Sequence, residues 1–478
     1  MIRLLAMGGY IFQSAAAFAL IFAVSHILRP EDYTAFSLAL ATSQFFAVAA
    51  FEWVNLAAVR YLASARGDDA ARLCSSLFSA EALSATVLVF GAVAASCSGR
   101  VEPVSVLLGL AIAIMQSLTD LHFTMIRVSG RLGISALLFV ARASTQLAGA
   151  VSGALFWGTP TAALLGVLLG HALGILLSSI MDHSLLQWSP SRTKRSELAE
   201  FCRYGMLAAG ASVTHLTVPM MIRFIVIGGL GDSGAGAAAA GFSMALDLLQ
   251  RPFTILVSAI HTVNYPEVVQ HFDGGTEAAA KESTARLFEF IFCTTVIMLG
   301  GIMAFLPDAA RLFVPSMLVS AFLAAAPGAA TFYFLHTHLQ ATFAVLPHLQ
   351  KSALRLIIVA ACQLVVVSTL VAIITVTGTT VSKAFVAASV GTGVVMILAS
   401  GPTLRFGAIP RWTLLLAATV GAIVIGALGV LPSENIPWFV SKIVFSGVVV
   451  LVIAYFGDFL QLEKRRPSRF HQRSEEFS

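Results

Sequence analysis

The chain has 478 residues, of which 58% are hydrophobic and 11% are charged, and its formal net charge is +5. Soluble domains carry about 25% charged residues, so this composition excludes an ordinary soluble protein. The apolar runs are about 18–25 residues long and do not alternate with polar residues, which fits membrane-crossing helices and excludes a transmembrane β-barrel. We therefore predict an all-α polytopic membrane protein. Basic residues flank the apolar runs, so the positive charge gives no reason to expect a nucleic-acid partner.

Fourteen transmembrane helices are predicted in chain order. They cover residues 7–28, 36–58, 75–97, 102–126, 134–157, 161–181, 203–228, 235–264, 285–306, 317–341, 354–376, 381–399, 413–431 and 437–460. The first apolar stretch is longer than the core of a typical signal peptide and lacks a clear cleavage site, so we interpret it as a span. Five scattered cysteines show no paired spacing, and we expect no disulfide framework, metal site or cofactor.

Lysine and arginine are distributed unevenly between the two sides of these spans. With a cytoplasmic N-terminus, the cytoplasmic segments hold 21 of these residues and the outer ends hold five, namely Arg29, Arg100, Arg311, Lys383 and Lys442. Cytoplasmic loops are enriched in basic residues in membrane proteins. The sequence therefore predicts that both termini lie in the cytoplasm.

The span list also predicts the domain organisation. Residues 1–182 form an N-terminal six-helix lobe, 183–202 a cytoplasmic linker and 203–400 a second six-helix lobe. Two additional helices follow in 401–460, and 461–478 form a cytoplasmic tail. Six is an even number, so both lobes would enter the membrane in the same direction, as in transporters built from parallel repeats.

Sequence motifs for an enzyme are missing. There is no GxxxxGK[ST] phosphate-binding loop, no Ser/His/Asp spacing and no cluster of metal ligands. The predicted outer loops are short, whereas an enzyme that assembles lipid-linked sugars would usually carry a substantial outer loop. We therefore expect a protein that is not an enzyme.

Three arginines lie inside predicted spans and are the candidate substrate-binding residues. A charge at the centre of a bilayer costs about 2.5–3.5 kcal/mol on insertion scales, so such residues face a cavity or a partner. Arg142 lies near mid-membrane, and it either binds an anion in a central cavity or pairs with a neighbouring helix. Arg223 lies in the outer third of its span, where it faces a cavity or extends toward the surface. Arg251 is the third candidate.

Three acidic residues inside spans are candidates for ion coupling or for charge pairs. Asp247 lies four residues before Arg251, on the same helix face, and the two form either a self-neutralising pair or a pair that opens to engage substrate or a proton. Glu52 and Asp120 either titrate in an ion-coupled cycle or pair with nearby arginines. Two arginines are near enough in sequence: Arg60 and Arg127. Two other acids lie near the inner surface and are expected to be solvated: Glu81 and Glu289.

Two segments of the sequence resemble a known family. The opening GGYIFQSAAAFALIFAVSHILRPEDYTAFSLALATS, followed by NLAAVRYLA, is similar to the Wzx-type polysaccharide flippases of the MOP (MATE-like) superfamily. Its turn, Leu28–Tyr33, resembles the family's L-x-P-E-x-Y/F-G motif, with Thr34 in place of glycine. The second segment, AAAAGFSMALDLLQRPFTILVSAIHTVNYPEV, resembles the family's eighth helix. One departure is at Arg223, beside which the family pattern would place an acid.

The resemblance implies two six-helix lobes around a central cleft that opens alternately to either side of a bacterial inner membrane. It implies a lipid-linked oligosaccharide on a polyprenyl pyrophosphate carrier as substrate, with polysaccharide assembly machinery as a possible partner. The arginines would then bind the pyrophosphate, with Arg142 as the leading candidate. The main alternative is a MATE-like exporter of small, often cationic compounds. A peptidoglycan-precursor flippase and an enzyme of lipid-linked sugar assembly are further alternatives.

Overall fold

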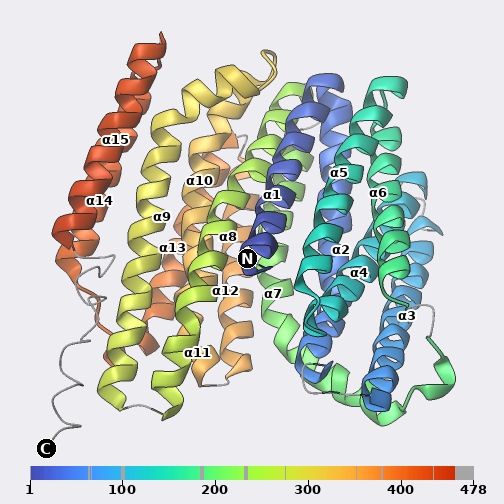
Figure 1. Ribbon diagram of the computed structural model, residues 1–478. Helices are drawn as coiled ribbons and strands as arrows, with labels where there is room; N and C mark the ends of the chain where they lie inside the picture. Colours follow the sequence, from blue (N-terminus) through green and yellow to red (C-terminus); the bar gives the residue numbers. More distant parts are fainter. Residues whose placement is uncertain are drawn as a thin grey trace, which may run out of the picture. The chain divides into compact units, whose positions relative to one another are not determined.

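The computed structural model is all-helical over the residues that it describes, which are 2–62, 65, 67–97, 103–183, 188–230, 235–274, 276–350, 352–377, 381–433 and 435–457. Within these ranges there are fifteen α-helices and two short 3-10 helices, and no strand (Figure 1). The predicted all-α fold is therefore confirmed. The predicted cytoplasmic tail, 461–478, lies outside the described residues.

The helices follow one another with short connections. The first six are α1 (Ile2–Ile27), α2 (Pro30–Leu62), α3 (Gly67–Cys97), α4 (Pro103–Val128), α5 (Leu132–Trp157) and α6 (Pro160–Met181). The next five are α7 (Arg195–Leu230), α8 (Ala235–Gly274), α9 (Glu277–Phe313), α10 (Val319–Ala341) and the short α11 (Val345–Leu349). The last four are α12 (Ala353–Val376), α13 (Val381–Phe406), α14 (Trp412–Ala427) and α15 (Ile436–Gly457).

Each predicted span overlaps one of these helices, although several helices, among them α3, α7, α8 and α9, extend about seven to ten residues beyond the predicted ends. Twelve helical segments of the described chain are long and apolar enough to cross a membrane. The apolar part of α1 is shorter, Ile11–Ile27, and α8 does not reach the same apolarity although it has 40 residues. The lower apolarity of α8 has a cause in its sequence, since this helix carries both Asp247 and Arg251 among several other polar residues.

The chain divides into two compact units. Unit 1 comprises Met1–Leu248, Phe313–Ala325 and Ser352–Gly391, and unit 2 comprises Leu249–Leu312, Ala326–Lys351 and Thr392–Ser478. The boundaries between the units fall inside α8, α10 and α13, at the last residue of α9, and between α11 and α12. The division into two six-helix lobes and an additional pair stays a prediction.

In unit 1, α5 and α6 run side by side with their backbones in contact (Figure 1). A Cβ atom added to Gly149 would lie 2.5 Å from the carbonyl oxygen of Gly166, and one added to Gly170 would lie 2.6 Å from the backbone nitrogen of Gln146. Small residues four apart allow this close approach in membrane helices. Helix α1 packs on α5, and α2 packs on both α4 and α7.

An apolar core of unit 1 lies among α2, α3, α4 and α7. Its fully buried members include Val54, Ala57, Leu77 and Leu121, and Phe201 from α7 packs against them. These residues fix the four helices relative to one another. Because α2, α3 and α4 carry Glu52, Glu81 and Asp120, this core also sets the spacing of those acids.

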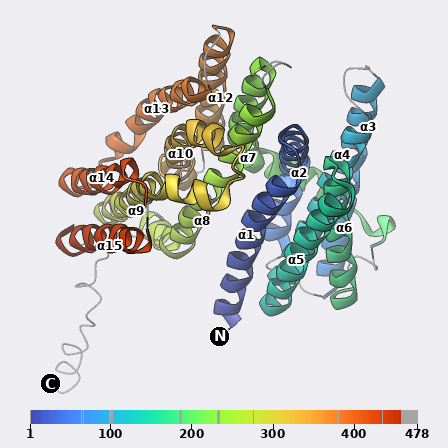
Figure 2. The same ribbon diagram turned by 90° about the horizontal axis from the view of Figure 1, so that it is seen from above.

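In unit 2, α14 and α15 form a side-by-side pair (Figure 2). Helix α14 approaches α9 closely, since a Cβ atom added to Gly300 would lie 2.5 Å from the carbonyl oxygen of Ala422. Most apolar side chains of α15 are exposed, including Val444, Val448 and Leu451. An apolar surface of this kind is expected where a helix faces lipid.

Candidate functional site

Arg142 lies on α5 and is buried in unit 1. Its Nη1 donates to Oδ1 of Asp120 on α4 at 2.5 Å, and its guanidinium lies 5.2 Å and 5.3 Å from the ring centres of Phe123 and Phe139. The Arg142 side chain also lies against Gly174 on α6, where an added Cβ would come within 3.4 Å of it. The charge of Arg142 is thus met by a carboxylate and two aromatic faces. Of the two sequence interpretations of Arg142, this geometry matches the pairing with a neighbouring helix.

The partner of Asp120 could not be identified from sequence spacing. The structure assigns it Arg142, 22 residues further along the chain. The Asp120 side chain is 34% exposed while that of Arg142 is 5% exposed. The pair therefore opens to its surroundings on the carboxylate side.

Two more acids lie near this pair. Glu52 on α2 and Glu81 on α3 both lie within electrostatic range of Asp120, and Glu81 lies beside the hydroxyl of Ser117. The prediction that Glu81 is solvated is wrong, because its side chain is buried. Position along the helix suggested the inner surface, whereas the rotation of α3 turns Glu81 inward. Three carboxyl groups thus accompany the single arginine of this cluster.

Arg223 forms a second buried charge site, built from three helices of unit 1. Its Nη1 donates to Oγ of Ser37 on α2 at 2.7 Å, and its Nη2 donates to Oδ1 of Asp247 on α8. The Ser37 hydroxyl donates to Oδ2 of Asp247 at 2.5 Å. The carboxylate that meets Arg223 therefore comes from another helix, 24 residues further along the chain. Arg251 belongs to unit 2, where it is half-buried.

Unit 2 holds two buried acids of its own, each with a basic partner. Glu289 accepts hydrogen bonds from the backbone nitrogen of Arg411 at 2.6 Å and from its Nε at 3.0 Å. The prediction that Glu289 is solvated is therefore wrong, because the chain entering α14 covers it. Asp308 on α9 accepts from Nζ of Lys442 on α15 at 2.7 Å, and both side chains are buried.

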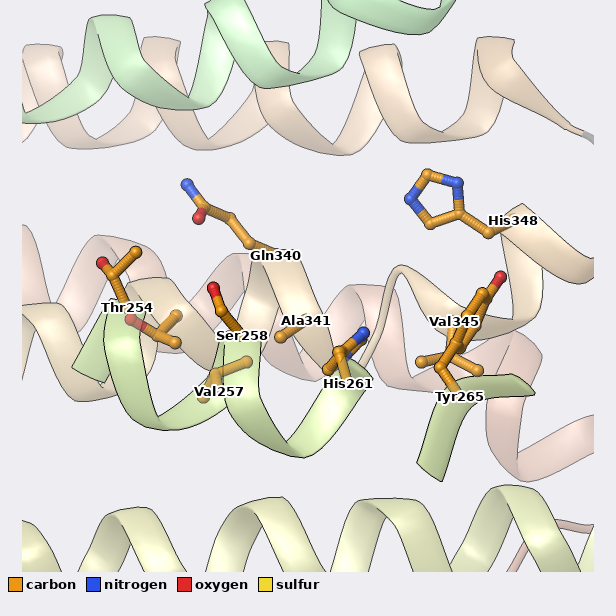
Figure 3. A pocket seen from close by; sticks show the side chains of 10 residues that line it. Thr254, Val257, Ser258, His261, Tyr265, Gln340, Ala341, Val345 and His348 are labelled. Carbon is orange, nitrogen blue, oxygen red and sulfur yellow. The ribbon is translucent and has the colours of Figure 1, made fainter. Parts of the chain in front are cut away.

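A polar cavity of about 390 Å³ lies in unit 2, between α8 on one side and α10 with α11 on the other (Figure 3). Four polar residues of α8 lie on it at spacings of four, three and four, namely Thr254, Ser258, His261 and Tyr265. The sequence analysis does not predict this site. A stripe of polar residues at helical spacing within a membrane helix nevertheless indicates a polar face that could have been recognised. The facing residues are Thr337, Gln340, Ala341, Val345 and His348, and Val257 completes the lining.

The sequence matches no family model, and it matches no curated protein sequence. The fold, in contrast, is similar to solved structures. A structure of the lipid II flippase MurJ, in an inward closed conformation, aligns with a TM-score of 0.68 at 12% identity and covers 96% of this chain and 99% of that chain.

Two transporters of the MOP superfamily are also similar. An inward-facing multidrug resistance MATE transporter aligns with a TM-score of 0.63 at 14% identity, covering 83% of this chain and 95% of that chain. A MOP superfamily transporter from Pyrococcus furiosus, described as having a binding pocket of reverse polarity, aligns with a TM-score of 0.56 at 16% identity, covering 85% and 95%. The chain therefore has the fold of MATE and MurJ transporters.

Proposed function

We propose that this protein is a flippase that moves a polyprenyl-pyrophosphate-linked oligosaccharide from the cytoplasmic to the periplasmic leaflet of a bacterial inner membrane, for surface polysaccharide biosynthesis. The observation that carries this proposal is the match to a lipid II flippase over 96% of the chain, whereas the multidrug transporter covers 83%. The turn at Leu28–Tyr33 and the second-half segment described above favour the polysaccharide branch. The substrate is then an anionic lipid, and both termini are cytoplasmic.

Arg142 is the leading group for binding the pyrophosphate. In the structure its guanidinium is already desolvated and held by Asp120, which is one-third exposed. An incoming pyrophosphate offers several oxygens to the same planar group and replaces the carboxylate as its partner. Binding is thus an exchange of anions at a fixed arginine, which avoids leaving a buried positive charge without a counter-charge.

Arg223 and Arg251 assist in this proposal. Arg223 is bonded to Asp247 and Ser37, so it too is presented with a carboxylate that a phosphate can replace. Protonation of Asp120 or Asp247 would weaken the ion pair and release the arginine to the substrate. We therefore assign these two acids, with Glu52, to ion coupling of the transport cycle.

A second function is favoured by a different observation. Around Arg142, three carboxyl groups accompany one arginine, since Glu52 and Glu81 lie near Asp120. An acid-rich interior suits a cation, so the alternative is a MATE-like exporter of small, often cationic compounds. The two functions differ in the sign of the charge that the interior must hold.

The test is a set of strains that differ only in this protein. Under the proposed function, cells that lack it lose a surface polysaccharide while the lipid-linked repeat unit accumulates on the cytoplasmic leaflet. Arg142→Ala reproduces this loss at normal expression, because the pyrophosphate enters without its counter-charge. Arg142→Lys recovers part of the activity, since a point charge replaces a bidentate fork.

The matched control is Arg29→Ala, because Arg29 is 82% exposed and pairs with Asp32 only at the surface. This variant should keep the polysaccharide. Cells that lack the protein, keep every surface glycan and become sensitive to cationic dyes would support the exporter. Full activity of Arg142→Ala would refute the assignment of Arg142 and leave the flippase proposal standing.

A further inference from the structure

The polar cavity of unit 2 has a lining that suits a neutral, hydroxyl-rich ligand. Its walls carry hydroxyl groups, one amide, two imidazoles and one phenol, and no Lys, Arg, Asp or Glu is among the described residues that line it. At about 390 Å³ the cavity falls in the size range of small-molecule sites, which is roughly 300–1,000 Å³. It is also far larger than the space that one ordered water needs.

One wall of the cavity is the polar face of α8. His261 and Tyr265 lie one turn apart on α8, with ring centres 5.6 Å apart and planes inclined by 17°. Beneath them, Val257 and Ile260 belong to an apolar cluster that includes Leu287 and Val345. The imidazole and phenol are therefore fixed in place by the packing of α8 rather than free to collapse into the cavity.

The opposite wall presents the side-chain amide of Gln340, which a neighbouring histidine holds in position. The side-chain nitrogen of Gln340 lies 2.8 Å from Nε2 of His336, which fixes the amide at the edge of the cavity. Figure 3 shows the Gln340 side chain across the cavity from Ser258, with the His348 ring further along the same side. Donors and acceptors thus line both sides of the space.

One polar atom of the lining is enclosed without a protein partner. Nε2 of His261 is buried and makes no hydrogen bond within the described part of the chain. Buried polar atoms are nearly always bonded to protein, water or a ligand. The hydrogen-bonding capacity of this nitrogen is therefore not used by the described residues.

We infer that this cavity is a sugar-binding subsite, which takes one or two hexose units of the glycan carried by the lipid. The inference rests on the proposed function. Sugars combine hydroxyl edges, which suit the amide, hydroxyl and imidazole groups, with C–H faces, which pack against a ring such as that of Tyr265. Among the described residues of the lining an anion finds no lysine or arginine, a cation finds no carboxylate, and two imidazoles are too few ligands for a closed metal site.

The test compares two probes on full-length protein purified in lipid nanodiscs. The first is the lipid-linked glycan extracted from membranes of cells that lack the protein, and the second is undecaprenyl pyrophosphate, which carries no sugar. His261→Phe keeps the ring beside Tyr265 and removes only its nitrogens. This variant should bind the glycosylated lipid about five- to tenfold more weakly, as expected for one lost hydrogen bond.

The sugar-free carrier should bind His261→Phe within about twofold of wild type, which also reports that the variant is folded. Ser258→Ala should behave in the same way, whereas Ser441→Ala, whose hydroxyl bonds to its own helix at Pro437, should change neither probe. Equal losses for both probes, or no loss for either, would overturn the sugar subsite. Wild-type protein that binds neither probe would overturn the proposed function as well.

A crosslinking experiment locates the glycan directly. Benzoylphenylalanine at Thr254, which lines the cavity, should form an adduct that contains sugar, as read by mass spectrometry. The same group at Ile255, the exposed neighbour that does not line the cavity, should form adducts with lipid chains only. Sugar adducts at both positions, or at Ile255 alone, would contradict the inference.

Discussion

The ion pair between Lys442 and Asp308 should hold α15 onto α9. Lys442 is 1% exposed and its Nζ donates to Asp308 at 2.7 Å and to the carbonyl of Ala304 at 2.9 Å. Asp308 also accepts from the backbone nitrogen of Ser433 at 2.7 Å. Removing one partner of a buried pair costs about 3–5 kcal/mol, because the other charge is left uncompensated. Lys442→Met should therefore weaken the docking of α15 by about this amount.

Hydrogen–deuterium exchange of the α15 amides measures this effect. Each 1.4 kcal/mol is a factor of ten, so exchange should accelerate by roughly two to four orders of magnitude. The double variant Lys442→Met with Asp308→Leu should lose much less than the sum of the single variants, since no charge remains buried. The control is Lys383→Met, because Lys383 is exposed. Exchange of α15 that is unchanged in Lys442→Met, or strictly additive losses in the double variant, would refute this reasoning.

Three further predictions concern unit 1. Arg223→Met alone should lower the free energy of unfolding by about 3–5 kcal/mol, as measured in a detergent unfolding titration. Adding Asp247→Leu should restore most of this stability, and additive losses would contradict the pairing. Gly166→Leu should cost about 3 kcal/mol or more, because the new side chain meets backbone, whereas Gly91→Leu, with open space around it, should be tolerated in the same titration. A reporter fused after Arg195 should read as cytoplasmic, and an outside signal there would contradict the predicted topology.

The fold class could be predicted because it depends on quantities that a sequence carries directly. The length and apolarity of each run fix where a helix can cross the bilayer, and every predicted span overlaps a helix of the described chain. Helix α8 shows the limit of this signal, since its polar residues lower its apolarity although it continues for 40 residues.

The partners of the interior charges could not be predicted, because they come from different helices. Sequence spacing suggested Arg251 as a partner for Asp247, whereas the partners found for Asp247 are Arg223 on α7 and Ser37 on α2. Likewise, the sequence places Lys442 among the basic residues at the outer ends of the predicted spans. Its burial depends on the rotation of α15 and on Asp308, 134 residues away.

Only one wall of the polar cavity could be predicted from the sequence. The stripe on α8 is visible in the sequence, since its members recur at helical spacing. The facing wall is built where α10 ends at Ala341 and α11 begins at Val345, and no pattern in that stretch indicates which helix it faces. The sequence therefore predicts the polar wall on α8 but not the residues that face it.

The contact between α5 and α6 has a mechanical consequence. Interfaces made of side chains can slide, since rotamers adjust as one helix moves past another, but here backbone touches backbone at Gly149 and Gly166. Backbone atoms in contact cannot adjust in the way that side-chain rotamers do, so the two helices behave as one stiff rod. Arg142 projects from this rod with its stem against Gly174. Any change in the side of the membrane that Arg142 faces must then come from tilting the whole rod, and not from swinging one side chain.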